Sequence, residues 1–422
     1  MKYLAPDYTR SVQSVYIDAA RYIIESDRSL ELLSHVECRS LSCISKLPSW
    51  VPDWSVDGPP VIFGAALPNL FFNASPGLSF ETTTSIRGTN LHTRGIFVDT
   101  IAEVAEHADR DPLASIAKVL LSIPKIYPNM TKIIDTTDER GVPFPLAMIE
   151  PGDDDLTEFA IDEDRCQSRV EAFWRTLLIN ACGGHKLAPL QYGYAFSDWL
   201  HLYLGNAVLR NIHADGNQNL DLLEKFGDVF KDIVGPWVKL ASEEPDAAIE
   251  PSMDEEVDVT VESKGPIRFL PPYDQDKGYL IKALFRPQDL NIDFGRLQVF
   301  QKQLNLANSQ RTIYRTSKGL LGNCFCSVKA GDEIWILPGA KVPLIFRRAK
   351  DEVGKYMLLG ESYVHGIRHG EALLAALSKA IAAFPKAGAV GAWAEGLWDM
   401  SQSEVVVKFL EQSQLLQNMI II

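Results

Sequence analysis

Residues 311–367 read RTIYRTSKGLLGNCFCSVKAGDEIWILPGAKVPLIFRRAKDEVGKYMLLGESYVHGI and decide the fold class. Short apolar runs such as EIWILP, VPLIFRR and KYMLLGESYV are separated by glycine, proline or charged residues at regular spacing. Runs of this length, rich in β-branched and aromatic residues and bounded by turn residues, are typical of antiparallel strands. The segment therefore predicts a small antiparallel β-barrel or curled sheet.

Helical patterns surround this β segment, so the expected class is α+β, with the sheet packed with a largely helical region. In the run TRSVQSVYIDAARYIIE, Thr9 is a candidate N-cap. Apolar residues recur in that run at intervals of three and four: Val12, Val15, Tyr16, Ala19 and Ile23.

A second helix is expected to start near Cys166 and to end at Gly183-Gly184. Its apolar face comprises Val170, Phe173, Trp174, Leu177 and Ala181. Between the two helices, LHTRGIFVDTIAEV at 91–104 has the β-branched and aromatic residues of a long strand.

The chain is expected to be organised in five parts. Residues 1–150 are the first part and comprise an N-terminal helix, a Trp/Pro loop and strands that contribute to the β core. The other four are a helical region over 151–241, an acidic linker over 242–266, the β-barrel-like region over 267–370, and C-terminal helices over 371–422.

Composition excludes several classes of function. A net charge of −14 argues against nucleic-acid binding, which needs a basic face. No apolar run approaches the roughly 18–20 residues of a membrane span, and MKYLAPDYTR lacks the apolar core of a secretory signal. The six cysteines are dilute for 422 residues, which favours reduced thiols and a cytoplasmic location.

No metal or cofactor site is predicted. Cys324-x-Cys326 is too closely spaced for a usual zinc site, and GDDDLTEFAIDED lacks the ligand order of a calcium loop. The motifs of phosphate-binding loops, α/β-hydrolase nucleophiles and zinc proteases are all absent from the sequence.

A set of ordered motifs runs through the β segment and its neighbours. The set is Arg311, Thr316-x-x-Gly319, Gly322, Gly331-Asp332, Leu337-Pro338-Gly339-Ala340, Pro343, Arg347, Tyr356, Gly360-Glu361, Tyr363-Val364-His365-Gly366 and Gly370-Glu371. In this order and spacing, the set resembles the C-terminal part of fungal heterokaryon incompatibility (HET) domain proteins. The runs TRSVQSVYIDAARYII, LPSWVPDWS, LHTRGIFVDTI and FWRTLLIN resemble the same family.

The resemblance covers the family's downstream region, about residues 5 to 375. The HET domain proper is a death-signalling module marked by a Tyr-x-Trp-Gly sequence and a Trp-Ile-Asp-x-x-Cys-Ile-Asn-Gln sequence, and neither occurs in these 422 residues. The resemblance therefore transfers neither the signalling function nor any catalytic residue.

Two groups of residues are candidates for a site. In LPSWVPDWS, Trp50 and Trp54 could form an aromatic wall that binds a substrate, with Asp53 as an acid, base or hydrogen-bond acceptor. The favoured alternative is structural, with the tryptophans and prolines fixing an irregular loop.

Glu361, Tyr363 and His365 alternate along the chain and would share one face of a strand, which suits acid–base catalysis. The alternative is a polar seam satisfied by hydrogen bonds. His92 and Arg94 share a face of the 91–104 strand, and Asp53 or Glu361 could compensate the charge of Arg94 as part of a substrate site.

Two functions remain open at this point, and the sequence does not decide whether the chain is an enzyme. One is a stand-alone HET-like module that binds a small-molecule ligand or a protein partner. The other is a cofactor-independent enzyme of fungal secondary metabolism, such as a cyclase, an isomerase or a catalyst of pericyclic assembly, acting on an apolar metabolite. The identity of the ligand and the oligomeric state are not indicated.

Overall fold

A computed structural model gives the fold. It describes residues 9–36, 44, 46–56, 63, 72–76, 78, 80, 84–105, 169–182, 186–188, 192–193, 195–196, 199, 294–308, 311–325, 327–350, 352–367, 373, 410 and 415–422. These residues fall into two compact units, and among them the chain passes from one unit to the other after Val104 and between Ile313 and Tyr314. The first unit includes Met1–Val104 and Tyr314–Ile422, and the second includes Asp154–Ile313.

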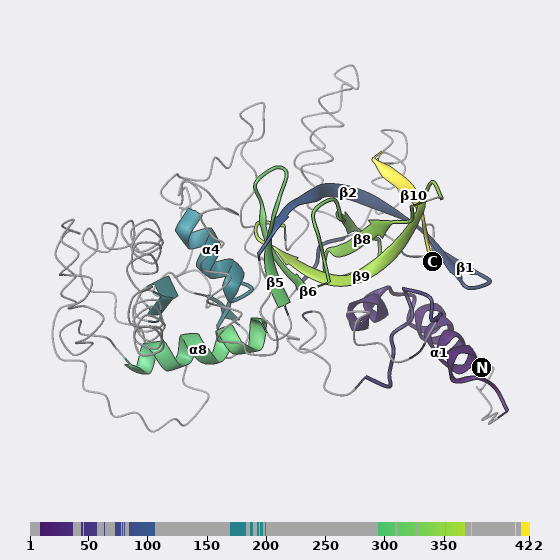
Figure 1. The fold of residues 1–422 in the computed structure, drawn as a ribbon, viewed down its shortest axis with the longest axis horizontal. Coiled ribbons are helices and arrows are strands. Elements are labelled where there is room, and N and C mark those ends of the chain that lie inside the picture. Colours follow the sequence, from purple (N-terminus) through teal and green to yellow (C-terminus); the bar gives the residue numbers. More distant parts are fainter. Residues whose placement is uncertain are drawn as a thin grey trace, which may run out of the picture. The chain divides into compact units, whose positions relative to one another are not determined.

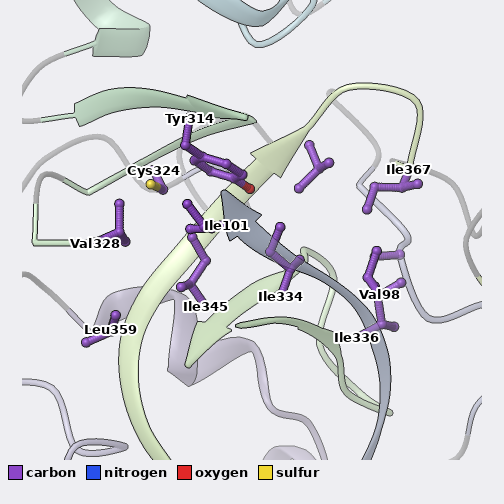
Figure 2. Close-up of a cluster of buried hydrophobic side chains, with 12 residues drawn as sticks. Val98, Ile101, Tyr314, Cys324, Val328, Ile334, Ile336, Ile345, Leu359 and Ile367 are labelled. Atoms are coloured by element: carbon purple, nitrogen blue, oxygen red, sulfur yellow. The ribbon is translucent and has the colours of Figure 1, made fainter. Parts of the chain in front are cut away.

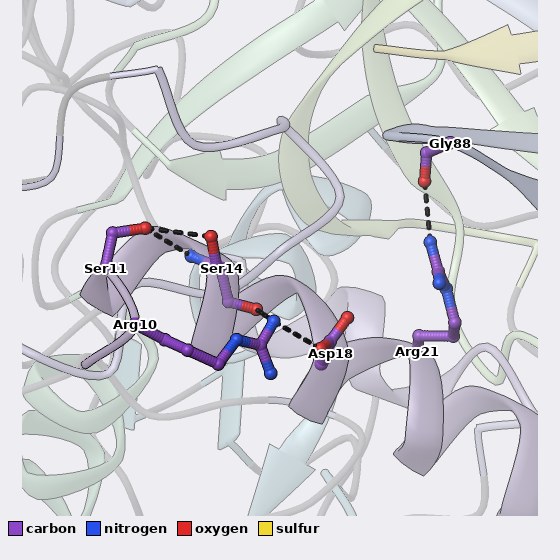
Figure 3. Close-up of polar contacts among 6 residues, drawn as sticks. All are labelled: Arg10, Ser11, Ser14, Asp18, Arg21 and Gly88. Atoms are coloured by element: carbon purple, nitrogen blue, oxygen red, sulfur yellow. Dashed lines mark hydrogen bonds and ion pairs between the residues drawn. The ribbon is translucent and has the colours of Figure 1, made fainter. Parts of the chain in front are cut away.

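The first unit begins with helix α1 (Val12–Asp27), which is followed by the 3-10 helix η1 (Glu31–His35). The N-cap of α1 is Ser11 and not the expected Thr9, because the Ser11 hydroxyl accepts a hydrogen bond from the Ser14 amide at 3.2 Å (Figure 3). The helix ends at Arg28, which has a left-handed backbone with φ 51°.

The buried face of α1 differs from the expected one. Ala20 and Ile24 are fully buried, whereas Val12 and Val15 are exposed. A periodic apolar pattern indicates that a helix forms, but here two of the five expected apolar residues are exposed.

The β region forms one eight-stranded sheet. Its strands are β1 (Ser85–Arg87), β2 (Asn90–Val104), β5 (Arg311–Thr316), β6 (Leu321–Phe325), β7 (Glu333–Ile336), β8 (Leu344–Arg348), β9 (Lys355–Val364) and β10 (Leu416–Ile421). The pairings run β2-β5-β6-β9-β8-β7, and β7 also pairs with β2. This circuit curls the sheet, with the long strands β2 and β9 on opposite sides (Figure 1).

The α+β class is therefore confirmed, as are the strands expected from LHTRGIFVDTIAEV, EIWILP, VPLIFRR and KYMLLGESYV. The sheet is not a regular barrel. Its registers shift in β2 and β8, and β1 and β10 lie off the circuit of pairings.

Every strand of the circuit contributes to one apolar cluster (Figure 2). The cluster includes Val98 and Ile101 of β2, Tyr314 of β5, Cys324 of β6, Ile334 and Ile336 of β7, Ile345 of β8, and Leu359 and Val364 of β9. The strands are buried on both faces around this cluster, since every residue of β6 and of β7 is buried.

Gly322 makes room for the largest member of this cluster. A Cβ atom at Gly322 would lie 2.1 Å from Cζ of Tyr314, so the tyrosine ring lies directly against the backbone of β6. The Tyr314 hydroxyl is 2.7 Å from that of Ser362, which gives the buried phenol a hydrogen-bond partner.

Two segments differ from the expected secondary structure. Residues 416–421, expected in the C-terminal helical region, form strand β10 between β2 and β9. Residues 294–308, expected in the β-barrel-like region, form helix α8 (Phe294–Asn308), in which Leu297, Phe300 and Leu304 are buried on one face. In both segments tertiary contacts select among structures that the local sequence allows.

The second unit contains helices α4 (Arg169–Leu177) and α8 and the short hairpin of β3 (Ala181–Cys182) and β4 (Lys186–Leu187). Phe173, Trp174 and Leu177 are buried as expected. The helix ends earlier than Gly183-Gly184, because Ile179 and Asn180 take left-handed conformations that lead into β3.

The acidic linker expected at 242–266, most of the helical region expected over 151–241 and most of the helices expected over 371–422 lie outside the described residues. Within the part of the chain that the structure describes, no helix is long and apolar enough to cross a membrane.

Candidate functional site

The LPSWVPDWS loop lies against the sheet through Ser49 and Trp50. The indole Nε1 of the fully buried Trp50 donates to the carbonyl of Thr89, in the turn between β1 and β2, at 2.8 Å. The Ser49 hydroxyl accepts from the Leu358 amide of β9 at 3.0 Å and donates to the carbonyl of Ile422, which follows β10. Two adjacent side chains thereby attach the loop to β9, to the β1–β2 turn and to the residue after β10.

Asp53 is engaged by the backbone of its own loop region. Its Oδ1 accepts from the Ser55 amide at 3.0 Å and from the Ser55 hydroxyl, and its Oδ2 accepts from the Ile44 amide at 3.1 Å. Asp53 as a whole is 8% exposed. A side chain that caps local amides in this way stabilises an irregular turn.

Trp54 has a different environment from Trp50. It is 43% exposed, and its ring meets that of Tyr16 edge to face with centroids 5.0 Å apart. The exposed large apolar side chains of α1 are Val12, Val15 and Tyr22. The two tryptophans of the motif thus lie in different settings, one in the core and one on the surface.

Glu361 and Tyr363 of β9 point away from the core cluster. The intervening Ser362 bonds to Tyr314 inside the cluster, and because neighbours alternate along a strand, Glu361 and Tyr363 lie on the opposite face. There the fully buried Glu361 accepts the amide of Phe63 through Oε1 at 2.7 Å.

His365 completes this group directly after β9. The Tyr363 hydroxyl lies 2.9 Å from Nδ1 of His365, and both side chains are buried. The Tyr363 ring also meets Phe72 edge to face at 6.5 Å, and Phe72 stacks on Phe63 at 6.2 Å. Tyr363 and His365 thus bond to each other, and Glu361 bonds to Phe63, whose ring stacks on the Phe72 ring that contacts Tyr363.

His92 and Arg94 lie on β2 and are partly exposed. Nε of Arg94 donates to Oδ1 of Asn418 on β10 at 3.2 Å, and His92 faces Ser85 and Ile420 in the register. These contacts tie β2 to its neighbours β1 and β10. All eight candidate residues belong to the first unit, and Asp53 bonds to Ile44 and Ser55 of its own loop region.

Two carboxylates of the β7–β8 hairpin are held by consecutive arginines. Arg347 binds Asp332 through two bonds of 2.8 and 2.7 Å, and this bonding raises the pKa of Arg347. Arg348 binds Glu333, which raises the pKa of Arg348, and its guanidinium lies 5.7 Å from the ring of Tyr356.

Some of the residues that organise the site carried little signal in the sequence. Ser49 lies in LPSWVPDWS, where a serine between proline and tryptophan gives no indication of a partner 309 residues away. Phe63 and Phe72 lie in a run of mixed composition. Gly322 belongs to the family-like set of motifs, but its close approach to Tyr314 depends on how the strands lie in the sheet.

The chemistry available to the buried group is limited by its burial. Tyr363 and His365 could pass a proton between them, but in this arrangement they are covered by the protein itself. Among the described residues, no three His, Cys, Asp or Glu side chains gather so as to hold a metal ion.

Comparison with known proteins gives one match. Residues 295–380 match the family model of the Het-6 beta-barrel domain. No curated protein and no solved structure gives a significant match. Over residues 295–380, the chain therefore shows the kinship with the HET family that its sequence motifs predicted.

Proposed function

We propose that the chain is a HET-family-like binding module, whose partner is a protein that docks on helix α1 and Trp54. The observation that carries this proposal is where the exposed apolar side chains lie. Eight large apolar side chains are exposed among the described residues, and four of them, Val12, Val15, Tyr22 and Trp54, belong to α1 or pack beside it.

These four residues are arranged as one surface. At about 100° per residue, Val12, Val15 and Tyr22 lie within a quarter turn of one another on the helix. Trp54 adjoins them through Tyr16. Val12 is 55% exposed, Val15 40% and Tyr22 43%, so each would lose substantial apolar area to a partner.

The bonds of the candidate catalytic groups also support a binding role, because each group has a structural partner. Asp53 caps backbone amides, Glu361 accepts the Phe63 amide, and Tyr363 and His365 bond to each other under Phe72. Each group has a structural use that explains its residue type without a reaction.

The experiment compares three full-length variants as bait in the cells that make the protein. Trp54→Arg and Val15→Arg place a charge on the proposed surface, and Val353→Arg is the control, because Val353 is fully exposed in the turn before β9. We expect a protein that co-purifies with the unmodified chain and with Val353→Arg, and that is depleted at least about tenfold by the other two, because a charge in an apolar contact is costly. Equal recovery with all three variants would refute the proposed surface.

The circuit of strand pairings supports a finer description of the module as a small barrel. β7 returns to β2, and all six strands of the circuit contribute to one apolar cluster. In this view, the barrel is a rigid scaffold that presents α1 and its neighbouring loop. The low cysteine content supports a cytoplasmic location for this binding module.

A second candidate function, a cofactor-independent enzyme of fungal secondary metabolism, is favoured by one observation. The 2.9 Å contact between the Tyr363 hydroxyl and the His365 imidazole is suited to proton transfer. Candidate apolar metabolites would be incubated with the unmodified chain, His365→Ala and Asp53→Ala. Turnover lost in His365→Ala but kept in a folded Trp54→Arg chain would favour the enzyme over the binding module.

A further inference from the structure

Strand β10 is not needed to close the circuit of pairings. That circuit passes through β2, β5, β6, β9, β8 and β7, and β10 pairs with β2 and β9 off this path. On β2, β10 pairs antiparallel with Leu91–Ile96, whereas β5 pairs further on, from Ile101. On β9, β10 pairs at Lys355 and Tyr356, whereas β6 pairs with Ser362–Val364.

β10 therefore occupies the space between β2 and β9 that β5 and β6 do not reach. Without it, both strands would present unpaired backbone groups in this space. Such groups are a template for an added strand.

Side chains on both faces of β10 fit the strands around it. Leu416 packs into an apolar cluster with Ile96 and Leu373. Met419 lies against Gly95, where an added Cβ atom would be 3.2 Å from its sulfur. Because the two contacts lie on opposite faces of the strand, the space selects apolar residues at defined positions.

Polar contacts fix the register and the end of β10. Asn418 accepts a hydrogen bond from Nε of Arg94 at 3.2 Å. The Ile422 carbonyl accepts from the Ser49 amide at 2.9 Å, and the Ser49 hydroxyl accepts from the Leu358 amide of β9. Ser49 thus continues the pairing of β9 beyond the point where β10 ends.

We infer that β2, β9 and Ser49 form a strand-recognition site, which β10 occupies as an internal ligand and from which an extended peptide of the same chemistry can displace it. The partner chemistry is an uncharged segment that runs antiparallel to β2, with apolar residues in the positions of Leu416, Met419 and Ile421. The closed circuit keeps the core cluster intact during the exchange. This inference does not depend on the partner proposed for α1.

Hydrogen exchange of the unmodified full-length chain tests whether β10 opens separately. The Ile420 amide bonds to the Gly354 carbonyl and the Ile422 amide to the Tyr356 carbonyl, so both report on β10. We expect these amides to exchange at least about tenfold faster than the His365 amide, which bonds to Leu321 of β6, because local opening needs less free energy than global unfolding. Exchange of the Ile420, Ile422 and His365 amides at the same rate, as in one common unfolding, would overturn the inference.

Displacement is tested with a fluorescent peptide that carries the sequence of residues 415–422, LLQNMIII. Met419→Asp in the full-length chain weakens its own β10, so we expect it to bind the peptide at least about tenfold more tightly than the unmodified chain does. Ser49→Ala in the Met419→Asp chain should weaken this binding, and a peptide with the Met419→Asp change should not bind.

Circular dichroism establishes that each variant is folded before the peptide is added. A folded Met419→Asp chain that does not bind the peptide would overturn the inference. The inference would also be overturned if the peptide with the Met419→Asp change bound as tightly as the unaltered peptide. If Met419→Asp is unfolded, the milder Asn418→Ala replaces it, and the same two outcomes apply.

Discussion

Replacing Gly322 with alanine should destabilise the sheet far more than a glycine-to-alanine change usually does. The new Cβ atom would lie 2.1 Å from Cζ, 2.3 Å from the hydroxyl oxygen and 2.6 Å from Cε1 of Tyr314. Ordinary carbon contacts are about 3.5–4.0 Å, so the ring would have to move by more than 1 Å, by this rough comparison. Tyr314 is fully buried and bonded to Ser362, so it has little freedom to move.

The magnitude follows from two costs. Overpacking a core costs about 1–3 kcal/mol. Breaking the buried hydrogen bond between Tyr314 and Ser362 adds about 1–3 kcal/mol. We therefore expect Gly322→Ala to lower the free energy of unfolding by about 2–6 kcal/mol, measured by urea unfolding with tryptophan fluorescence and circular dichroism.

Two comparisons isolate the contact with the ring. Gly319→Ala makes the same chemical change where nothing lies within 4 Å, so its cost should be limited to the left-handed backbone at φ 88°, about 1–2 kcal/mol. In a Tyr314→Leu chain the clash partner is smaller, so the added cost of Gly322→Ala should fall by at least about 1 kcal/mol. Additive costs in this double-mutant cycle would refute the packing argument.

Three further predictions concern charges and the loop. Burial raises the pKa of Tyr314 well above its ordinary value, so the contribution of the neutral phenol to stability is complete below about pH 10 and is lost as the pH rises further. In urea titrations between pH 8 and 11, the free energy of unfolding should therefore fall, and it should fall less steeply in Tyr314→Phe. Equal slopes in the two chains would contradict this. Arg347→Ala leaves the buried Asp332 without its bidentate partner and should lower the free energy of unfolding by about 2–3 kcal/mol. Arg348 is more exposed, so Arg348→Ala should cost roughly 1 kcal/mol or less. A larger cost for Arg348→Ala in chemical unfolding would contradict this order. Ser49→Ala breaks the link between β9 and the residue after β10 and should cost about 1–3 kcal/mol and speed amide exchange at Leu358, whereas unchanged exchange there would show that the loop does not hold β9.

The sequence predicted the strands well where one physical signal was strong. KYMLLGESYV forms β9 over Lys355–Val364, because β-branched, aromatic and other apolar residues bounded by charged and glycine-containing turns leave few alternatives. LQNMII could not be assigned from its own residues. Its strand character comes from the space between β2 and β9, which are distant in the sequence.

The candidate site was predictable in part. The alternation of Tyr363 and His365 predicted that they share one face, because the period of a strand is two, and their side chains bond to each other at 2.9 Å. Their burial depends on Phe63 and Phe72, which come from a segment about 290 residues earlier in the chain and lack a periodic pattern. The two tryptophans of LPSWVPDWS look equivalent in the sequence, but Trp50 is buried and its indole nitrogen donates to the Thr89 carbonyl, whereas Trp54 is 43% exposed.

The most direct test of the account is a double-mutant cycle on Tyr363 and His365 in urea unfolding. The central claim is that the side chains with the most evident catalytic chemistry hold the fold. The account predicts that Tyr363→Phe and His365→Ala each lower the free energy of unfolding by about 1–3 kcal/mol, with a coupling energy of at least about 0.5 kcal/mol. Unchanged stability in both variants would contradict the claim, because the pair would then serve something other than the fold.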